Sequence, residues 1–132
     1  MNDMAKYDIK KRYLIFYLCL IILGAFLMFC RWMNHIDPSI TILPAFLLNH
    51  VTNFSLCLML LLIIGFIILM FGGNIKNVTV VALAVAFLNV IYEVFLPMLN
   101  TPDIIDALSG ICGTAAAYVF LTVLKKNGLT VK

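Results

Sequence analysis

Three of the six acidic residues in this chain lie in one short stretch, YEVFLPMLNTPDIIDALSG, residues 92–110. They are Glu93, Asp103 and Asp106, and apolar sequence flanks them on both sides. A carboxylate next to lipid is unfavourable unless it faces a bundle interior or a wet cavity. Acids that share a site can share a proton, bind a cation or pair with a base. We therefore expect the functional site of the protein in this stretch.

Glu93 and Asp106 are expected to lie at a similar depth. Glu93 stands four residues before Pro97, and Asp106 stands four residues after Pro102. Since the two prolines would bound a short loop between antiparallel helices, each acid should sit about one helical turn from that loop. Two carboxylates at the same depth repel each other, so the pair needs a shared proton, a cation or a base.

Asp103 has a simpler explanation. The string NTPDIID is typical of a helix start, in which Thr101 can cap, Pro102 suits the first helical position and Asp103 adds a carboxylate to the first turn. Asp103 can therefore stabilise this helix, or it can join the site of the other acids.

Further polar side chains are expected near these acids. His50 opens an apolar run with Asn53 about one turn later, and Asn89 lies four residues before Glu93, on the same helical face. Histidine with carboxylates can bind a divalent metal or transfer protons. The spacing matches no metal motif, and no nucleophile accompanies it. We therefore predict a ligand-binding pocket with no cofactor, and an enzyme is the less favoured class.

Arg31 offers an alternative role for the acids. It is the only lysine or arginine expected on this side of the membrane. A bridge from Arg31 to Glu93 or Asp106 would make the acids structural. The arginine could also anchor one acid and leave the other to bind a ligand, so both alternatives stand.

The elements that must position these residues are membrane helices. The chain has 132 residues, of which 64% are hydrophobic and 11% charged, whereas soluble domains carry about 25% charged residues. Its mean hydropathy is +1.12. Four apolar runs approach or exceed the roughly 20 residues that cross a hydrocarbon core. The spans are predicted at about 13–31, 51–71, 77–97 and 103–124.

We therefore predict one all-α domain over residues 1–132, a four-transmembrane-helix bundle. Between the first two spans, the apolar run SITILPAFLL (39–48) has about half the spanning length. It predicts a short interfacial or re-entrant helix, broken at Pro44. In the fourth span, Gly110, Gly113 and Ala117 share a helical face with Asp106, which predicts close helix packing there.

The distribution of basic residues predicts the orientation. Eight of the nine Lys and Arg residues lie in the two terminal segments and the loop between the second and third spans. The positive-inside rule then places both termini in the cytoplasm and the stretch 92–110 on the outer side. The net charge of +3 is explained by contacts with anionic lipid. The expected partner is the lipid bilayer, and no nucleic acid is predicted.

Two groups of residues resemble the VanZ-like family of bacterial membrane proteins. An acid at the end of one span, a short proline-bounded loop and a helix start with an aspartate and a glycine resemble the family's C-terminal signature. A histidine followed four residues later by an aromatic residue resembles its opening of an earlier span. The likeness covers mainly residues 50–117 and rests on His50, Phe54, Glu93, Asp103, Asp106 and Gly113.

This resemblance implies a multi-pass protein of the bacterial plasma (inner) membrane with a role in glycopeptide antibiotic resistance or in the cell envelope. We expect an outward-facing pocket that binds an envelope-related small molecule or a lipid head group. The residues expected to line it are Glu93, Asp106, His50, Asn53, Asp103, Asn89 and Arg31.

Two other functions remain open from the sequence. One is a small ion- or proton-coupled transporter, which some relatives have been labelled, and a homo-oligomer would help to complete its pathway. The other is a non-catalytic accessory subunit whose acids are only structural. Flux across a membrane would identify the first, whereas an abundance loss in an Arg31 variant equal to that of the acid variants would identify the second.

Overall fold

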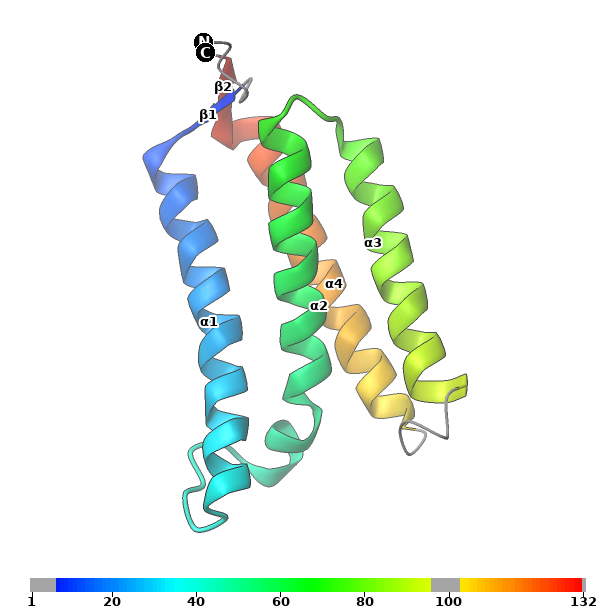
Figure 1. Ribbon diagram of the computed structural model, residues 1–132. Coiled ribbons are helices and arrows are strands. Elements are labelled where there is room, and N and C mark those ends of the chain that lie inside the picture. Colours follow the sequence, from blue (N-terminus) through cyan, green and yellow to red (C-terminus); the bar gives the residue numbers. More distant parts are fainter. Residues whose placement is uncertain (1–6, 96–102, 132) are drawn as a thin grey trace.

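Four long helices run side by side in the computed structural model, which describes residues 7–95 and 103–131 (Figure 1). Two of them continue into π-helical segments, labelled η1 and η2. The elements are β1 (Tyr7–Ile9), α1 (Lys11–Ile36), α2 (Ala45–Met70), α3 (Ile75–Val90), η1 (Ile91–Phe95), α4 (Ile104–Val123), η2 (Leu124–Gly128) and β2 (Leu129–Val131).

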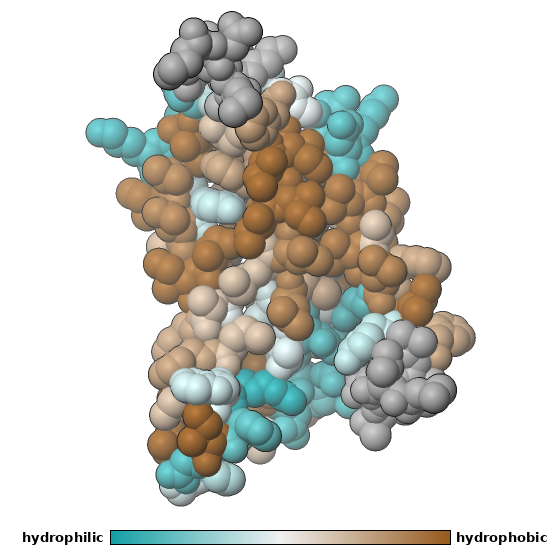
Figure 2. Space-filling view, viewed as in Figure 1, coloured by the Kyte–Doolittle hydropathy of each residue, from teal (hydrophilic) through white to brown (hydrophobic). Residues whose placement is uncertain are grey.

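Each helix is long and apolar enough to cross a membrane. The four candidate spans contain 21 to 26 residues, and about 20 residues are needed. Their outer surfaces are apolar, and large side chains such as Ile22, Val80 and Phe95 are 65–69% exposed. Figure 2 shows hydrophobic residues over most of the upper and middle surface of this face. The predicted bundle of four apolar, span-length helices is confirmed.

Helix α2 is the centre of the bundle, because α1, α3 and α4 all pack against it. Leu58, Leu61 and Leu62 of α2 are at most 1% exposed and meet Leu121 of α4 in the core. The small-residue face predicted for α4 is also confirmed, since Gly110, Gly113 and Ala117 are buried. A Cβ atom on Gly113 would lie 2.2 Å from the backbone oxygen of Phe54. Glycine is thus what lets α4 approach the backbone of α2 closely.

The helix predicted between the first two spans is not present. Helix α1 continues to Ile36, and α2 already begins at Ala45, so the segment splits between a loop and the start of α2. Pro44 is the N-cap of α2 rather than a break within a helix. The physical reason is that proline lacks a backbone N–H and suits a helix start, so the apolar residues after it extend the second span.

The loop between α1 and α2 is held by Asp37. Its Oδ1 accepts hydrogen bonds from the backbone nitrogen (3.0 Å) and hydroxyl (2.7 Å) of Ser39. These bonds favour the charged carboxylate and lower the pKa of Asp37, which is fully exposed. Helix α1 therefore ends at a local turn just before Pro38.

Two strands of three residues each, which the sequence did not predict, accompany the helical bundle. Strands β1 and β2 pair antiparallel, with Tyr7 opposite Val131 and Ile9 opposite Leu129. The Nζ of Lys10 also donates a hydrogen bond to the backbone oxygen of Asn127 (2.8 Å). The pairing joins both ends of the described chain at one end of the bundle (Figure 1).

Candidate functional site

Polar side chains gather at the end of the bundle opposite the strands. They come from the first turns of α2, from η1 and from the start of α4, three elements that the antiparallel order brings to the same end. Figure 2 shows this hydrophilic region in its lower half, between apolar surfaces. All seven residues predicted to line a site belong to this end, but they form several separate groups of contacts.

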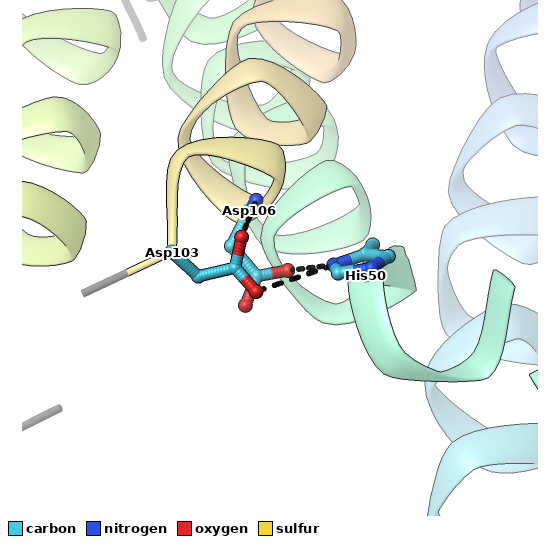
Figure 3. A group of neighbouring side chains, drawn as sticks. All are labelled: His50, Asp103 and Asp106. Atoms are coloured by element: carbon cyan, nitrogen blue, oxygen red, sulfur yellow. Dashed lines mark hydrogen bonds and ion pairs between the residues drawn. The ribbon is translucent and has the colours of Figure 1, made fainter. Parts of the chain in front are cut away.

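The first group is the acid–histidine cluster, formed by His50, Asp103 and Asp106. Nδ1 of His50 lies 2.8 Å from Oδ1 of Asp106 and 4.0 Å from Oδ2 of Asp103. Figure 3 shows the imidazole of α2 pointing at both carboxylates at the start of α4. The three side chains are 15%, 37% and 21% exposed, respectively, so they are sheltered but reachable.

Asp103 occupies its place because it caps α4. It is the N-cap residue, and its Oδ1 accepts hydrogen bonds from the backbone nitrogens of Ile105 (2.8 Å) and Asp106 (3.4 Å). The predicted capping role of this acid is thus confirmed, although one position away from the predicted first turn. Its second oxygen, Oδ2, faces His50. The predicted Thr101 cap and Pro102 at the first helical position lie outside the described residues.

The second group is the Asn53–Glu93 pair. Nδ2 of Asn53 donates a hydrogen bond to Oε1 of Glu93 at 2.7 Å. Glu93 is only 2% exposed, and it lies in the π-helical turn η1. Such turns widen a helix locally and occur often at functional sites. The backbone nitrogen of Asp103 donates to the carbonyl oxygen of Glu93 (3.3 Å), which joins the two helix ends directly.

Two more side chains tie the helices together beneath these groups. Nδ2 of Asn89 donates to the carbonyl oxygen of Ala107 (2.9 Å), and the hydroxyl of Ser109 donates to the carbonyl oxygen of His50 (2.7 Å). A Cβ atom on Gly110 would lie 2.4 Å from the Asn89 side chain, so this glycine makes room for it. Asn89 therefore positions α4 against α3, and Ser109 positions α4 against α2.

Arg31 has different partners from those considered in the sequence. Its Nη1 donates hydrogen bonds to the carbonyl oxygens of Leu48 and Asn49, the latter at 2.7 Å. Within residues 7–95 and 103–131, His50 is the only ion-pair partner of Asp103 and Asp106. The bridge from Arg31 to Asp106 is therefore absent, because the guanidinium is used to hold α1 against the start of α2. The partner shown for Glu93 is Asn53.

We expect Arg31→Met to lower the free energy of unfolding by about 1 kcal/mol, because hydrogen bonds to the two carbonyl oxygens are lost while the apolar stem is kept. The measurement is the unfolding midpoint in an SDS titration of the purified chain in mixed micelles. Lys11→Met, at the other end of α1, is the control. If Arg31→Met lowered the free energy of unfolding as much as Asp106→Asn does, the alternative in which Arg31 and the acids are only structural would be supported.

An apolar cavity of about 370 Å³ adjoins the acid–histidine cluster. Its walls come from α1, α2 and α4, and we call it the α1–α4 cavity. Helices α1 and α4, which line it on two sides, diverge toward this end (Figure 1). His50 and Ser109 are the polar residues of a lining that is otherwise apolar apart from Cys112. Phe46 and Leu108 on its rim are 60% and 56% exposed. The cavity is thus open toward the side where lipid would lie.

A second cavity, of about 480 Å³, lies between α2 and α3 and is lined in part by Thr52, Asn53, Asn89 and Tyr92. The Thr52 hydroxyl is buried and has no hydrogen-bond partner in the part of the chain that is described. Sequence reasoning missed Thr52 as a member of this end of the bundle. The signal for Thr52 was its position between His50 and Asn53, two residues already selected.

Comparison with protein-family models, with curated protein sequences and with solved structures finds no match for this chain. Its function must therefore be inferred from the site.

Proposed function

We propose that this chain is a VanZ-like membrane protein that binds an amphipathic molecule of the cell envelope. The observation that carries the proposal is the position of His50, which belongs both to the acid–histidine cluster and to the wall of the apolar α1–α4 cavity. A polar head at the cluster and an apolar chain in the cavity would be bound together. An envelope lipid or a lipid-linked small molecule has this form.

The size and lining of the cavity support such a ligand. Binding pockets for small molecules are commonly about 300–1,000 Å³, mostly apolar, with a few fixed polar groups. The α1–α4 cavity, at about 370 Å³, lies within this range. Its fixed polar group is His50, whose backbone oxygen is held by the Ser109 hydroxyl. The exposed rim residues Phe46 and Leu108 would let the chain of a lipid enter from the side.

The resemblance and the charge distribution give the proposal its location. The described lysines, together with Arg12, lie at the end of the bundle that carries the strands, and the acid–histidine cluster lies at the other end. With the basic end inside, the cluster would face outward from a bacterial plasma membrane, and both termini would be cytoplasmic. The ligand would then be reached from the outer leaflet.

The direct test is to extract the chain from membranes with its lipid and identify bound molecules by native mass spectrometry. We expect a retained amphiphile with the wild-type chain. Cys112→Phe, which adds a ring to the α1–α4 cavity, should remove it. Val119→Phe is the matched control, because Val119 is on the same helix, 61% exposed, and outside the cavity lining. Equal retention by both variants would exclude the cavity as the binding site.

A cellular test addresses the polar end of the same site. Glu93→Gln and Asp106→Asn should each reduce a glycopeptide-resistance or envelope phenotype while membrane abundance stays at the wild-type level. Both changes keep the size of the side chain and remove its charge. If both variants retain the full phenotype, the acids do not serve binding, and the role of an accessory subunit is favoured.

A further inference from the structure

The acid–histidine cluster brings three metal-ligating side chains together within a membrane protein. One ligand atom each from His50, Asp103 and Asp106 lies within 4.8 Å of the other two. They come from two helices, so α2–α4 packing and not local sequence creates the group (Figure 3). No metal motif is visible in the sequence because His50 lies 53 and 56 positions before the two aspartates.

The charges of this cluster are unbalanced. Two carboxylates face one imidazole, and in the described chain no lysine or arginine pairs with Asp103 or Asp106. Arg31, at the same end of the bundle, donates to the carbonyl oxygens of Leu48 and Asn49 instead. Two carboxylates at close range favour a bound cation, and more strongly where nearby lipid lowers the dielectric constant.

The geometry suits a small divalent ion. Zinc binds histidine nitrogen and carboxylate oxygen at about 2.0–2.2 Å, which places neighbouring ligand atoms about 3–3.5 Å apart in a tetrahedral site. The separations from Nδ1 of His50, 2.8 Å to Asp106 and 4.0 Å to Asp103, bracket this value. Small side-chain rotations would therefore be enough to place all three atoms around one ion.

Two of the three ligands are also held in position by their neighbours. The Phe46 ring packs edge-on against the His50 imidazole, with centroids 4.9 Å apart. The backbone nitrogen of Ile105 fixes Oδ1 of Asp103 and leaves Oδ2 for the cluster. Such outer contacts orient ligands and strengthen metal binding.

We propose that His50, Asp103 and Asp106 bind a divalent transition-metal ion of the zinc class. Nδ1 of His50 would bind through its lone pair, and one oxygen of each aspartate would complete three protein ligands. Binding through Nδ1 requires that the proton between His50 and Asp106 leaves this nitrogen, so that the neutral imidazole carries its proton on Nε2. Three protein ligands leave a position open for water or a ligand.

The open position would select the head group of the bound molecule. A divalent ion neutralises the two aspartates and would accept an oxygen anion such as a phosphate or carboxylate. This consequence rests on the proposed function, because it requires that an amphiphile binds beside His50. The metal site itself does not depend on it.

The experiment uses the full chain, purified in detergent without a histidine tag and stripped of metal with a chelator. Zn²⁺ is then titrated calorimetrically, and Co²⁺ is added in parallel to record its visible absorption. We expect one ion per chain. His50→Gln and Asp106→Asn should each weaken binding by more than about 100-fold, since loss of an outer contact alone weakens it about 10–100-fold. Thermal melting of each variant without metal shows whether it remains folded.

His35→Gln and Asp37→Asn are the matched controls, because both residues are exposed at the same end of the bundle. Both should bind Zn²⁺ as the wild type does. Absence of stoichiometric binding, or equal weakening by the control variants, would overturn the metal site. Retention of an amphiphile after chelation, with no Zn²⁺ binding, would leave the proposed function intact. Zn²⁺ binding that requires His50, with no amphiphile retained, would support the metal site and contradict the proposed function.

Discussion

Gly113→Ala is expected to destabilise the bundle by about 2–3 kcal/mol, although alanine favours helices. A Cβ atom at this position would lie 2.2 Å from the backbone oxygen of Phe54 and 3.0 Å from its carbonyl carbon. Backbone atoms cannot move aside as a side chain can, so α2 and α4 must separate. Overpacking of this kind commonly reduces stability by about 1–3 kcal/mol. The measurement is the free energy of unfolding from an SDS titration in mixed micelles.

The matched control is Gly24→Ala in α1. The new Cβ would meet Cγ and Sδ of Met59, at 2.7 and 2.9 Å, which belong to a flexible side chain on α2. Relief by rotation of this side chain should keep the loss below about 1 kcal/mol, since alanine itself gains about 0.5–1 kcal/mol over glycine within a helix. Equal unfolding midpoints for the two variants would contradict the close approach of α4 to the α2 backbone.

Asn53→Leu is expected to lower the free energy of unfolding by about 2 kcal/mol. The change removes the donor that lies 2.7 Å from Oε1 of Glu93. Hydrogen bonds to charged groups contribute about 1.5–3 kcal/mol, and a buried acceptor that loses its donor is unfavourable. Glu93 is 2% exposed, so water has little access to replace the bond. The same SDS titration measures the loss.

Asn49→Leu is the control for this substitution, because Asn49 precedes Asn53 by one turn in α2 and its side chain is exposed. It should change stability by less than about 0.5 kcal/mol. Glu93→Gln should also be mild, since the amide oxygen of glutamine can accept the same hydrogen bond. If Asn53→Leu is no worse than Asn49→Leu, the Asn53–Glu93 pair does not stabilise the fold.

The helices were predictable from the sequence because lipid imposes a simple rule: about 20 apolar residues and no unpaired backbone groups. Two features escaped this rule. Pro44 carries the same local signal whether it breaks a helix or begins one, so the segment 39–48 was assigned wrongly. Strands β1 and β2 pair across almost the whole chain, from Tyr7 to Val131, and no local pattern reports such a distant partner.

The sequence predicted which residues lie at the same end of the bundle, but not which of them are in contact. Helical periodicity and the two flanking prolines placed Glu93 and Asp106 at the same end, with His50 and Asn53 opposite them. Periodicity could not decide that His50 bonds Asp106 while Asn53 bonds Glu93, because that depends on how α2 rotates between η1 and α4. Nor could it place Arg31, because its partners are backbone carbonyl oxygens near the start of α2, and backbone groups carry no sequence signal.

The pairing of β1 with β2 has a consequence for how the chain is assembled. Synthesis runs from the N-terminus, so β1 is made before any of the helices, and its partner follows all four. β1 therefore has no strand to pair with until all four helices have been synthesised. This small sheet can close only after all four helices have been made, and its ladder links the start of α1 to the end of the fourth helix.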